Sequence, residues 1–255
     1  MDLGIRGRVA LVTGASSGLG EAVALALADE GAAIAVAARR LDRLESVVHE
    51  AKRRGASTAH AFLVDFEEPG SVGTLLTHVR EKLGDVQILV ANSGGPRAGT
   101  FRDLTLDDWD HGYRTTLRGI LELVRGVAPA MTAGGWGRIV ALTSTSVKQP
   151  IPNLALSNVF RTALVSALKS LSLEVARDGV TVNAIATGRV LTDRLRHLYP
   201  DEDSIRKAAE AEVPIGRVAT PAEFAPLVAF LCGEPARYVT GQTIAIDGGL
   251  IKALF

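Results

Sequence analysis

Residues 9–20, which read VALVTGASSGLG, decide the fold. A short apolar run ends at Thr13, and a glycine-rich turn then leads directly into the helix-period stretch Leu19–Glu30. Glycines in such a turn let the backbone approach a pyrophosphate closely, and the start of the helix offers free N–H groups to the phosphates. The spacing is G-x-x-x-G-x-G rather than G-x-G-x-x-G, so the position of the turn between a strand and a helix is what indicates a nucleotide site. The alternative is a glycine-rich turn that holds no ligand.

The rest of the chain alternates in the same way between short apolar runs and helix-period stretches. The runs expected to form strands are Val9–Thr13, Ala33–Ala37, Ala59–Val64, Ile88–Ala91, Arg138–Leu142, Val180–Ile185 and Thr243–Ile246. The stretches expected to form helices are Leu19–Glu30, Leu41–Arg54, Gly70–Leu83, Thr105–Met131, Leu154–Arg177 and Pro221–Leu231. This alternation predicts an α/β fold, a doubly wound, seven-stranded parallel sheet with helices on both faces. We expect residues 1–255 to form one domain, with the charged segment 189–213 as a lid over a site.

Charge and cysteine content exclude several classes of function. The chain has 28 basic and 28 acidic residues, so its formal net charge is zero, which argues against nucleic acid or a membrane surface as partner. Its single cysteine, Cys232, cannot form an internal disulfide, which fits a reducing compartment. No leader is evident, and the longest apolar run, Ala22–Ala28, is far shorter than the ~20 residues that cross a bilayer. We therefore expect a cytoplasmic protein, and the spacing of its histidines predicts no metal site.

Motifs spread over the whole chain resemble those of one family. They are Thr13-Gly14 to Leu19-Gly20 after the first strand, Asp65 after the third, Ala91 to Gly94 after the fourth, Ser144 after the fifth, Val239 to Gln242, and Asp247 to Gly249 near the end. Together they resemble the short-chain dehydrogenase/reductase family, and within it the β-ketoacyl-carrier-protein reductase and glucose dehydrogenase types. The resemblance implies a single Rossmann domain, a small-molecule substrate and a homotetramer, paired in part through the stretches Thr105–Met131 and Leu154–Arg177.

The choice of dinucleotide is expected to depend on the end of the second strand. An acidic residue there would bond the ribose 2′-hydroxyl of NAD, whereas an arginine accommodates the 2′-phosphate of NADP. In this chain the acid's position is Ala38, and Arg39 and Arg40 follow it. With no carboxylate to repel a phosphate and guanidinium groups able to grip it, the sequence predicts NADP(H) in preference to NAD(H). The alternative is that Arg39 and Arg40 are simply the solvated start of a helix.

The resemblance also implies which residues would hold the cofactor. Asp65 would meet the adenine amino group, residues 92–94 the adenosine ribose, and Thr192 the nicotinamide carboxamide. The full set is Gly14, Ser16, Ser17, Gly18, Leu19, Arg39, Arg40, Asp65, Phe66, Asn92, Ser93, Gly94, Arg161, Gly188, Val190 and Thr192. One departure precedes the last loop, where the family's usual Pro-Gly is Thr187-Gly188.

The catalytic positions of the family are largely changed in this chain. By resemblance, a Tyr delivers the proton, a Lys four residues on lowers the pKa of its phenol, a Ser polarises the carbonyl, and an Asn holds a relay water. In the family register Ser144 is retained, but the Tyr is Ser157, the Lys is Arg161 and the Asn is Thr116. An aliphatic hydroxyl is a far weaker acid than a phenol, and an Arg does not give up its proton in a protein. Arg161 is therefore expected to clamp the cofactor ribose rather than to transfer a proton.

Other groups are candidates for the missing proton donor. Lys148 lies four residues after Ser144, in an expected loop, and could act as an acid if its side chain is partly desolvated. The alternative is that Lys148 is a solvated loop residue. Tyr113 and Tyr199 are the phenols that could face the site, and Tyr113 could equally be helix packing.

Two functions from different classes fit these observations. The first is an NADP(H)-dependent oxidoreductase of a small alcohol or carbonyl compound with an atypical active site that lacks the Tyr-x-x-x-Lys pair. The second is an NADP(H)-binding sensor or scaffold protein with weak or no turnover, which the changes at Thr116, Ser157 and Arg161 favour. A third reading, an enzyme that uses the same site for chemistry other than hydride transfer, also stays open.

Overall fold

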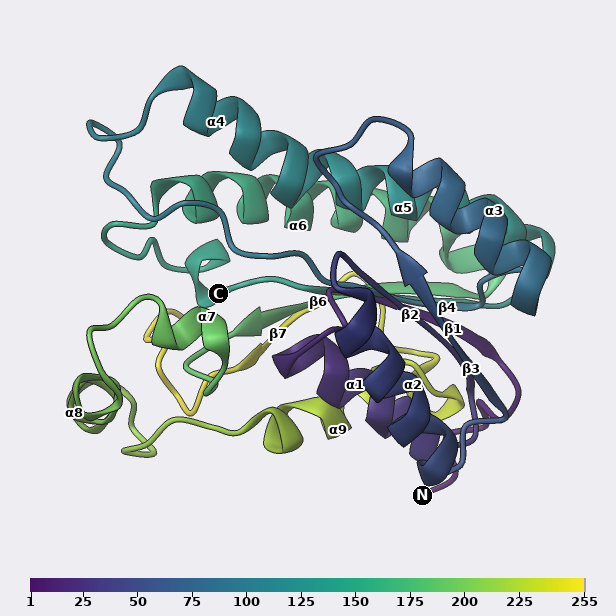
Figure 1. The fold of residues 1–255 in the computed structure, drawn as a ribbon. Coiled ribbons are helices and arrows are strands. Elements are labelled where there is room, and N and C mark those ends of the chain that lie inside the picture. Colours follow the sequence, from purple (N-terminus) through teal and green to yellow (C-terminus); the bar gives the residue numbers. More distant parts are fainter. Residues whose placement is uncertain (255) are drawn as a thin grey trace.

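A parallel sheet of seven strands runs through the part of the chain that the computed structural model describes, residues 1–254 (Figure 1). The strands are β1 (Val9–Thr13), β2 (Ala33–Ala38), β3 (Thr58–Leu63), β4 (Ile88–Ala91), β5 (Gly137–Leu142), β6 (Val180–Thr187) and β7 (Thr243–Ile246). Their order is β3-β2-β1-β4-β5-β6-β7, so the direction of winding reverses between β1 and β4. In open α/β sheets a ligand is expected at such a reversal, beyond the carboxyl ends of the strands.

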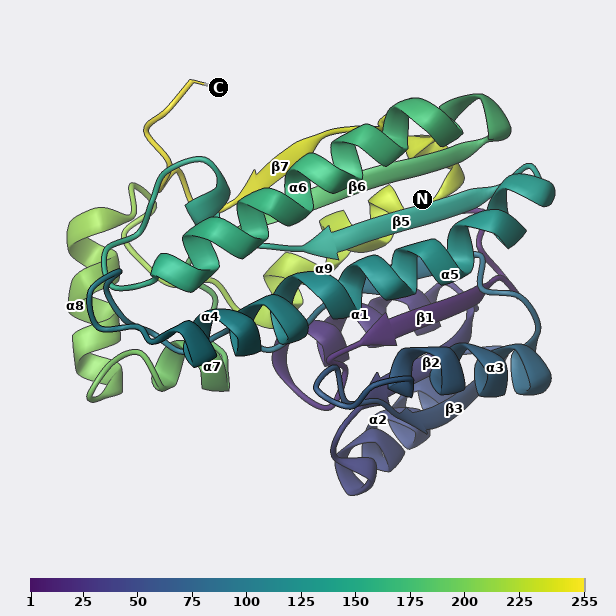
Figure 2. The same cartoon turned by 90° about the horizontal axis from the view of Figure 1, so that it is seen from above.

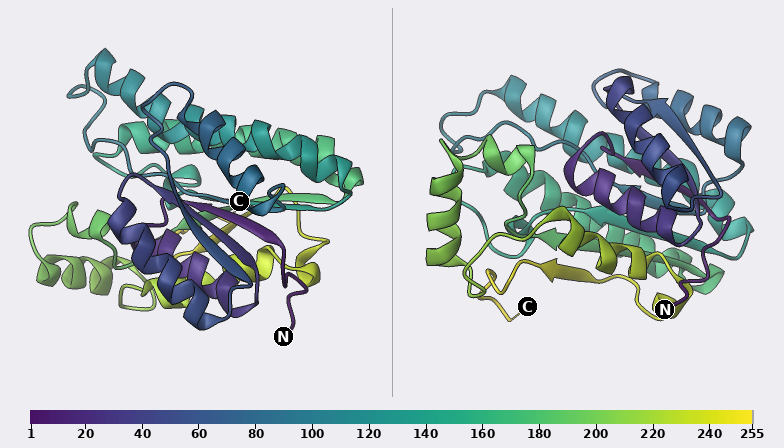
Figure 3. Two further views of the ribbon diagram at one scale, coloured as in Figure 1. Left: turned by 45° about the vertical axis from the view of Figure 1, so that its right-hand side comes forward. Right: turned by 60° about the horizontal axis from the view of Figure 1, so that its bottom comes forward.

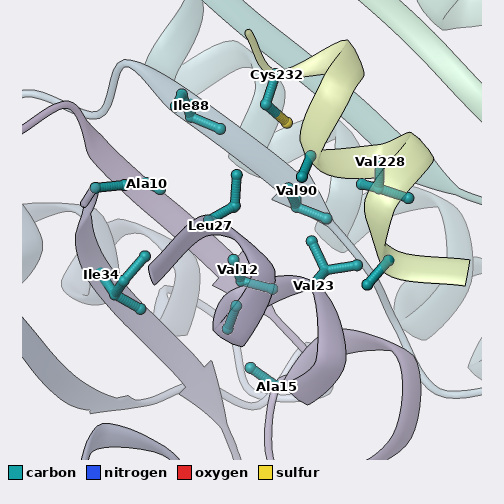
Figure 4. Packing of buried hydrophobic residues seen from close by; sticks show 14 of the residues in the cluster. Ala10, Val12, Ala15, Val23, Leu27, Ile34, Ile88, Val90, Val228 and Cys232 are labelled. Carbon is teal, nitrogen blue, oxygen red and sulfur yellow. The ribbon is translucent and has the colours of Figure 1, made fainter. Parts of the chain in front are cut away.

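Helices cover both faces of this sheet. On one face lie α1 (Gly18–Asp29), α2 (Leu41–Arg54) and α9 (Pro221–Leu231), and on the other α3 (Ser71–Leu83), α5 (Gly119–Ala133) and α6 (Ala155–Val175), as two further views show (Figure 3). Each layer has its own apolar core. Figure 4 shows part of the first, in which Val23 and Leu27 of α1 and Val228 of α9 pack on Val12 and Val90 of the sheet.

The carboxyl edge of the sheet carries most of the irregular structure. The strands point toward the side of the molecule where α7 (Asp193–Arg196) and α8 (Glu202–Glu212) lie (Figure 2). These two helices belong to the segment that follows β6. Because parallel strands end at a common edge, the loops after β1, β4, β5 and β6 converge there with α7 and α8.

The predicted fold class is confirmed, and so are most element positions. The predicted bounds of β1, β4, β7, α2 and α9 agree with the structure, and the other strands differ by one or two residues at an end. Residue 255 of the expected domain lies outside the described residues. The edge strands β3 and β7 are only partly buried, because each has a neighbour on one side alone.

Two predicted elements needed correction. The stretch 105–131 is not one regular helix: α4 (Leu106–Gly112) passes through a π-helical turn, Tyr113–Arg118, into α5. A π turn inserts an extra residue per turn and so rotates the side chains that precede it relative to those that follow, which periodicity alone does not reveal. Segment 189–213, predicted only as a charged lid, contains α7 and α8.

Among residues 1–254 no helix combines the length and apolar character that crossing a membrane requires.

The glycine-rich turn depends on a close approach between α1 and the backbone. Gly20 lies in the first turn of α1, and a Cβ atom there would clash with the backbone of Gly14 and Ala15. Gly14 itself has a φ of 59°, in the left-handed region that favours glycine. Glycine at these two positions therefore sets the distance between α1 and the end of β1.

We predict that Gly20→Ala lowers the free energy of unfolding by about 2 kcal/mol, because the added methyl group meets fixed backbone atoms. The matched control is Gly73→Ala, at the same third position of α3, where a Cβ atom meets nothing within 4 Å. There the same substitution should raise stability by about 0.5–1 kcal/mol, since alanine restricts the unfolded chain. Urea unfolding of both variants measures the difference, and equal effects at the two sites would contradict the steric argument.

Candidate active site

A cavity of about 1070 Å³ opens at the carboxyl edge of the sheet. Its walls come from the turn after β1, the end of β2, the loops after β3, β4 and β5, the start of α6, and the segment after β6. The residue types around it change from one end to the other. The glycine turn and Arg39 and Arg40 lie in its lining, and so do Ser144, Ser157 and Arg161. One continuous space therefore joins the predicted cofactor residues to the predicted catalytic positions.

The first turn of α1 leaves its backbone donors free. Ser17 occupies the N-cap position in extended conformation, and its side chain makes no capping hydrogen bond. The first N–H groups of a helix have no partner within the helix, and together with the helix dipole they attract a phosphate. Gly18, with a φ of 62°, faces Thr192 across the cavity: a Cβ atom there would lie 3.2 Å from Thr192 Cγ2. This narrow, donor-rich cradle fits the pyrophosphate of a dinucleotide.

The two arginines after β2 differ in what they contact. Arg40 Nη2 donates hydrogen bonds to Ser16 Oγ at 3.0 Å and to Ser17 Oγ at 3.1 Å, so its guanidinium lies over the glycine turn. Arg39 is exposed, and its Nη1 is 3.9 Å from Glu67 Oε1. Arg40 has no carboxylate within ion-pair distance among the described residues. Of the two arginines, Arg40 is thus the better placed to meet a phosphate near the glycine turn.

Ser144 and Ser157 are both joined to Ser146, Ser144 through the Ser146 backbone and Ser157 through its side chain. Ser144, the residue after Thr143 beyond β5, accepts a hydrogen bond at its Oγ from the Ser146 backbone N–H at 3.1 Å. Ser146 Oγ is 3.4 Å from Ser157 Oγ on α6, and both side chains are buried. Because Ser144 Oγ accepts from the backbone, its own hydrogen remains available to donate to a carbonyl oxygen in the cavity.

Arg161 is a buried cation one turn beyond Ser157 on α6. Its Nη1 donates to the Leu142 carbonyl at 2.9 Å, and among the described residues no carboxylate lies within ion-pair distance of it. Burial, together with the smaller effect of the charge of the nearby Arg194, lowers the pKa of Arg161 to about 10. Burial likewise lowers the pKa of Arg194, whose side chain is half-buried. The cavity thus holds two guanidinium groups that repel each other.

Every residue predicted from the sequence to hold the cofactor lines this cavity. The set is Gly14, Ser16, Ser17, Gly18, Leu19, Arg39, Arg40, Asp65, Phe66, Asn92, Ser93, Gly94, Arg161, Gly188, Val190 and Thr192. Asp65 Oδ1 accepts a hydrogen bond from the Glu67 backbone at 3.1 Å, which orients its carboxylate at the loop after β3. The glycine turn and the loop after β4 are joined directly, because Asn92 Nδ2 donates to the Gly14 carbonyl at 3.3 Å.

The structure does not bring all of the catalytic candidates to the cavity. Lys148 caps the short helical turn Thr145–Val147 and does not line the cavity, since the wall passes from Thr145 to Gln149. This placement gives no support to Lys148 as a proton donor. Thr116 is also outside the lining: it is fully buried in the π turn, its hydroxyl makes no hydrogen bond, and Thr115 lines the cavity in its place. The register change introduced by the π turn explains this difference.

Of the three tyrosines, only one faces the cavity. Tyr199, in the segment after β6, lines it and accepts a hydrogen bond at its hydroxyl from Arg189. Tyr113 packs on Phe160 with ring centroids 6.3 Å apart and is not part of the lining. Tyr238 is fully exposed. Across residues 1–254 no three His, Cys, Asp or Glu side chains gather in a group suited to a metal ion.

Sequence reasoning missed Arg194. Its guanidinium lies against the loop after β4, where Nη2 donates to the Pro96 carbonyl at 2.8 Å. The residue is separated from that loop by almost a hundred positions in sequence, and its only signal is the density of basic residues from Arg189 to Arg196. Such a cluster is usually a solvated surface, so the sequence alone did not single it out.

Comparisons with known proteins agree with this architecture. A family model described as "Enoyl-(Acyl carrier protein) reductase" matches residues 14–251. The chain belongs to the short-chain dehydrogenase/reductase family. It is 33% identical to the 3-oxoacyl-[acyl-carrier-protein] reductase FabG of Pseudomonas aeruginosa, over 97% of this chain and 99% of that one. It is 36% identical to a putative ketoacyl reductase of Streptomyces coelicolor, over 95% and 96% of the two chains.

A solved structure of the family superimposes over the complete chain. The L-sorbose reductase of Gluconobacter frateurii, in complex with NADPH and L-sorbose, has a TM-score of 0.94 and 34% sequence identity, and covers 100% of both chains. Members of this short-chain dehydrogenase/reductase family are NAD(P)-dependent oxidoreductases, and this chain is one by its sequence, fold and relatives.

Two buried arginines of this family member provide a matched test of the site's electrostatics. Arg138 is also buried and has its pKa lowered by burial, but it donates to the Gly137, Gly179 and Gly233 carbonyls, approaches Glu234 at 3.5 Å and stacks on Trp136. Arg161 has one carbonyl partner and a repelling neighbour. An uncompensated buried charge destabilises a fold, whereas a paired one becomes destabilising only when its partner is left alone.

We therefore predict opposite effects for the same substitution. Arg161→Met should raise the free energy of unfolding of the protein without cofactor by about 1 kcal/mol, because removing the charge outweighs the loss of one hydrogen bond. Arg138→Met should lower it by about 2 kcal/mol, because Glu234 and three carbonyls lose their donor. Urea unfolding at pH 7 measures both, and a comparable loss of stability in the two variants would contradict a net cost at Arg161.

Proposed function

We propose that the protein is an NADP(H)-dependent oxidoreductase that interconverts a small alcohol and its carbonyl compound. The observation that carries the proposal is the continuous cavity that joins the glycine turn, Arg40 and the Ser144–Ser157–Arg161 group. The chain would act as a cytoplasmic homotetramer of single-domain subunits, as the family resemblance implies.

NADP(H) would be held along this cavity by the chain's own donors. The free N–H groups of the first turn of α1 would bind the pyrophosphate, and Arg40 with Arg39 the 2′-phosphate. Asp65 and Asn92 would hold the adenosine end, and Thr192 the carboxamide of the nicotinamide. When bound, the cofactor supplies or accepts the hydride. The G. frateurii relative supports the choice, since that protein was solved in complex with NADPH.

The chain's own residues would then orient the substrate. Ser144 would donate its free hydroxyl hydrogen to the carbonyl oxygen, which polarises the carbon toward hydride. Ser157 is too weak an acid to supply a proton by itself, and Arg161 keeps its proton at neutral pH, so neither replaces the Tyr and Lys of the family. The phenol of Tyr199, which faces the same cavity beside Arg189, and the imidazole of His111 are the neutral or cationic side chains of the wall that could supply the proton instead. This active site would be atypical for the family.

The cofactor assignment is tested by single arginine variants. Arg40→Ala should weaken NADPH binding by roughly tenfold to a hundredfold, the value of one or two charge-assisted hydrogen bonds, and leave NADH binding nearly unchanged. Arg39→Ala should have a smaller effect of the same kind, because Arg39 is partly engaged by Glu67. Arg43→Ala, one turn further along α2 and outside the cavity lining, is the control. Calorimetry measures the affinities of the parent protein and the three variants for both cofactors, and tighter binding of NADH than of NADPH by the parent protein would refute the assignment.

Turnover is tested by screening aldehydes and ketones with NADPH, and alcohols with NADP+. The absorbance of NADPH is followed in each assay. With any substrate found, Ser144→Ala should lower kcat/KM by roughly a hundredfold without loss of cofactor affinity, since a donor to the developing oxyanion is removed. Ser144→Thr, which keeps the hydroxyl, should retain most of the activity. Cofactor binding with no turnover on any compound would instead favour a sensor or scaffold, the function that the changes at Ser157 and Arg161 would explain.

A further inference from the structure

Two of the arginines that line the cavity, Arg161 and Arg194, share a feature that the proposed function does not use. Arg161 and Arg194 each donate one assigned hydrogen bond to a backbone carbonyl, that of Leu142 and that of Pro96. A guanidinium carries five N–H donors in a planar fork, so most of the donors of both side chains are uncommitted. Both residues line the cavity beside Ser144 and Ser157.

No carboxylate of the cavity wall serves as their counter-ion. Glu212 pairs with Arg189, and Asp193 Oδ1 is 3.3 Å from Arg196 Nη1. Glu67 is shared between Arg39 at 3.9 Å and His111 at 3.6 Å. Among residues 1–254 no ion pair joins Arg161 or Arg194 to an acidic side chain. An anion that enters from outside the chain would therefore supply the counter-ion that the cavity wall lacks.

Arg194 is held in a definite position for this purpose. Its guanidinium lies so close to the backbone of Gly95 that a Cβ atom at Gly95 would clash with Nε. The hydrogen bond to the Pro96 carbonyl, at 2.8 Å, fixes the same group from its other side. Since α7 carries Arg194, an anion bound there would also tie the segment after β6 to the loop after β4.

We propose that Arg194, together with Arg161, binds a carboxylate group of the substrate, so that the substrate is a carbonyl or hydroxy compound that bears a carboxylate, such as a 2-oxo acid. This proposal rests on the proposed oxidoreductase function. A planar carboxylate matches the planar donor fork of arginine and accepts two parallel hydrogen bonds from it. The position fits a substrate group because Arg161 lies one helical turn from Ser157 and in the same wall as Ser144, where the reacting carbonyl would be polarised.

A phosphate of the cofactor is the other source of such an anion. The glycine turn and Arg40 already provide donors for phosphates at a different part of the wall, whereas Arg194 rests on Gly95 and Pro96. A variant of Arg194 distinguishes the two sources. If Arg194 binds a phosphate of the cofactor, the variant must lose cofactor affinity, whereas if it binds a substrate carboxylate, cofactor affinity stays unchanged.

The test uses the full protein saturated with NADP+ and titrated by calorimetry with acetate, pyruvate and phenylpyruvate, and with the methyl esters of the two oxo acids. We expect at least one carboxylate to bind saturably and its ester not to bind. Arg194→Gln should weaken that carboxylate roughly tenfold or more, the value of charge-assisted hydrogen bonds, and leave NADP+ affinity within twofold. Arg194→Lys keeps the charge but not the planar fork of donors, so its carboxylate affinity should lie between those of the parent protein and Arg194→Gln.

The matched control is Arg196→Gln, in the same short helix, because Arg196 is exposed and pairs with Asp193 and Glu202. It should change neither carboxylate nor NADP+ affinity. The proposal is overturned if no carboxylate binds the saturated parent protein, if Arg194→Gln and Arg196→Gln behave alike, or if Arg194→Gln weakens NADP+ tenfold and leaves carboxylates unaffected. Carboxylate binding without turnover would leave this inference standing while the oxidoreductase function failed, so the two can be told apart.

Discussion

The site depends on one close contact, between the glycine turn after β1 and the loop after β4. Thr13 Oγ1 donates to the Asn92 carbonyl at 2.7 Å and accepts from the Asn92 backbone N–H at 3.0 Å, while Asn92 Nδ2 donates to the Gly14 carbonyl. These bonds lock together the two strands between which the sheet reverses its winding. Gly20 then lets α1 approach the same turn and present its free N–H groups to the cavity. A side chain at Gly14 or Gly20 would separate the parts that must converge on a phosphate.

At the end of the cavity that holds Ser144 and Arg161, the dominant feature is the free-energy cost of burying a charged side chain. A buried guanidinium with a single carbonyl partner and a second cation nearby lowers the stability of the protein without ligand. Arg138 shows that this chain can compensate such a group, with three backbone carbonyls, one carboxylate and an aromatic face. The absence of comparable compensation at Arg161, within the described residues, is typical of a functional position, where stability is exchanged for binding.

All of the residues expected to hold a cofactor lie in the cavity wall, whereas the residues expected at the catalytic positions do not all lie there, and the reason is physical. Gly14 and Asn92 follow strands directly and Ser17 directly precedes α1, so a correct assignment of strands and helices also locates their neighbours at the carboxyl edge. Arg194 reaches the cavity because segment 189–213 folds into helices, and the apolar residues of this segment show no periodicity from which those helices could be predicted. Thr116 was displaced by a π turn, which depends on packing and leaves no periodic signal. The expectation that Lys148 could donate a proton rests on its short distance along the chain from Ser144. The short helical turn Thr145–Val147 places Lys148 outside the cavity wall.

The exchange of Lys for Arg at position 161 separates two tasks that the family combines in one residue. By resemblance, the family's lysine holds the cofactor ribose, and its positive charge lowers the pKa of the neighbouring phenol. Arg161, with a pKa of about 10, stays cationic at neutral pH and can only bind and attract. With no phenol at position 157, its field has no acid on α6 to act on, so its remaining effect falls on whatever anion enters the cavity. A fixed cation beside a polarising serine favours a substrate that already carries a negative charge. It also requires that the proton come from elsewhere in the wall, and Tyr199, bonded to Arg189, is the phenol that the segment after β6 places there.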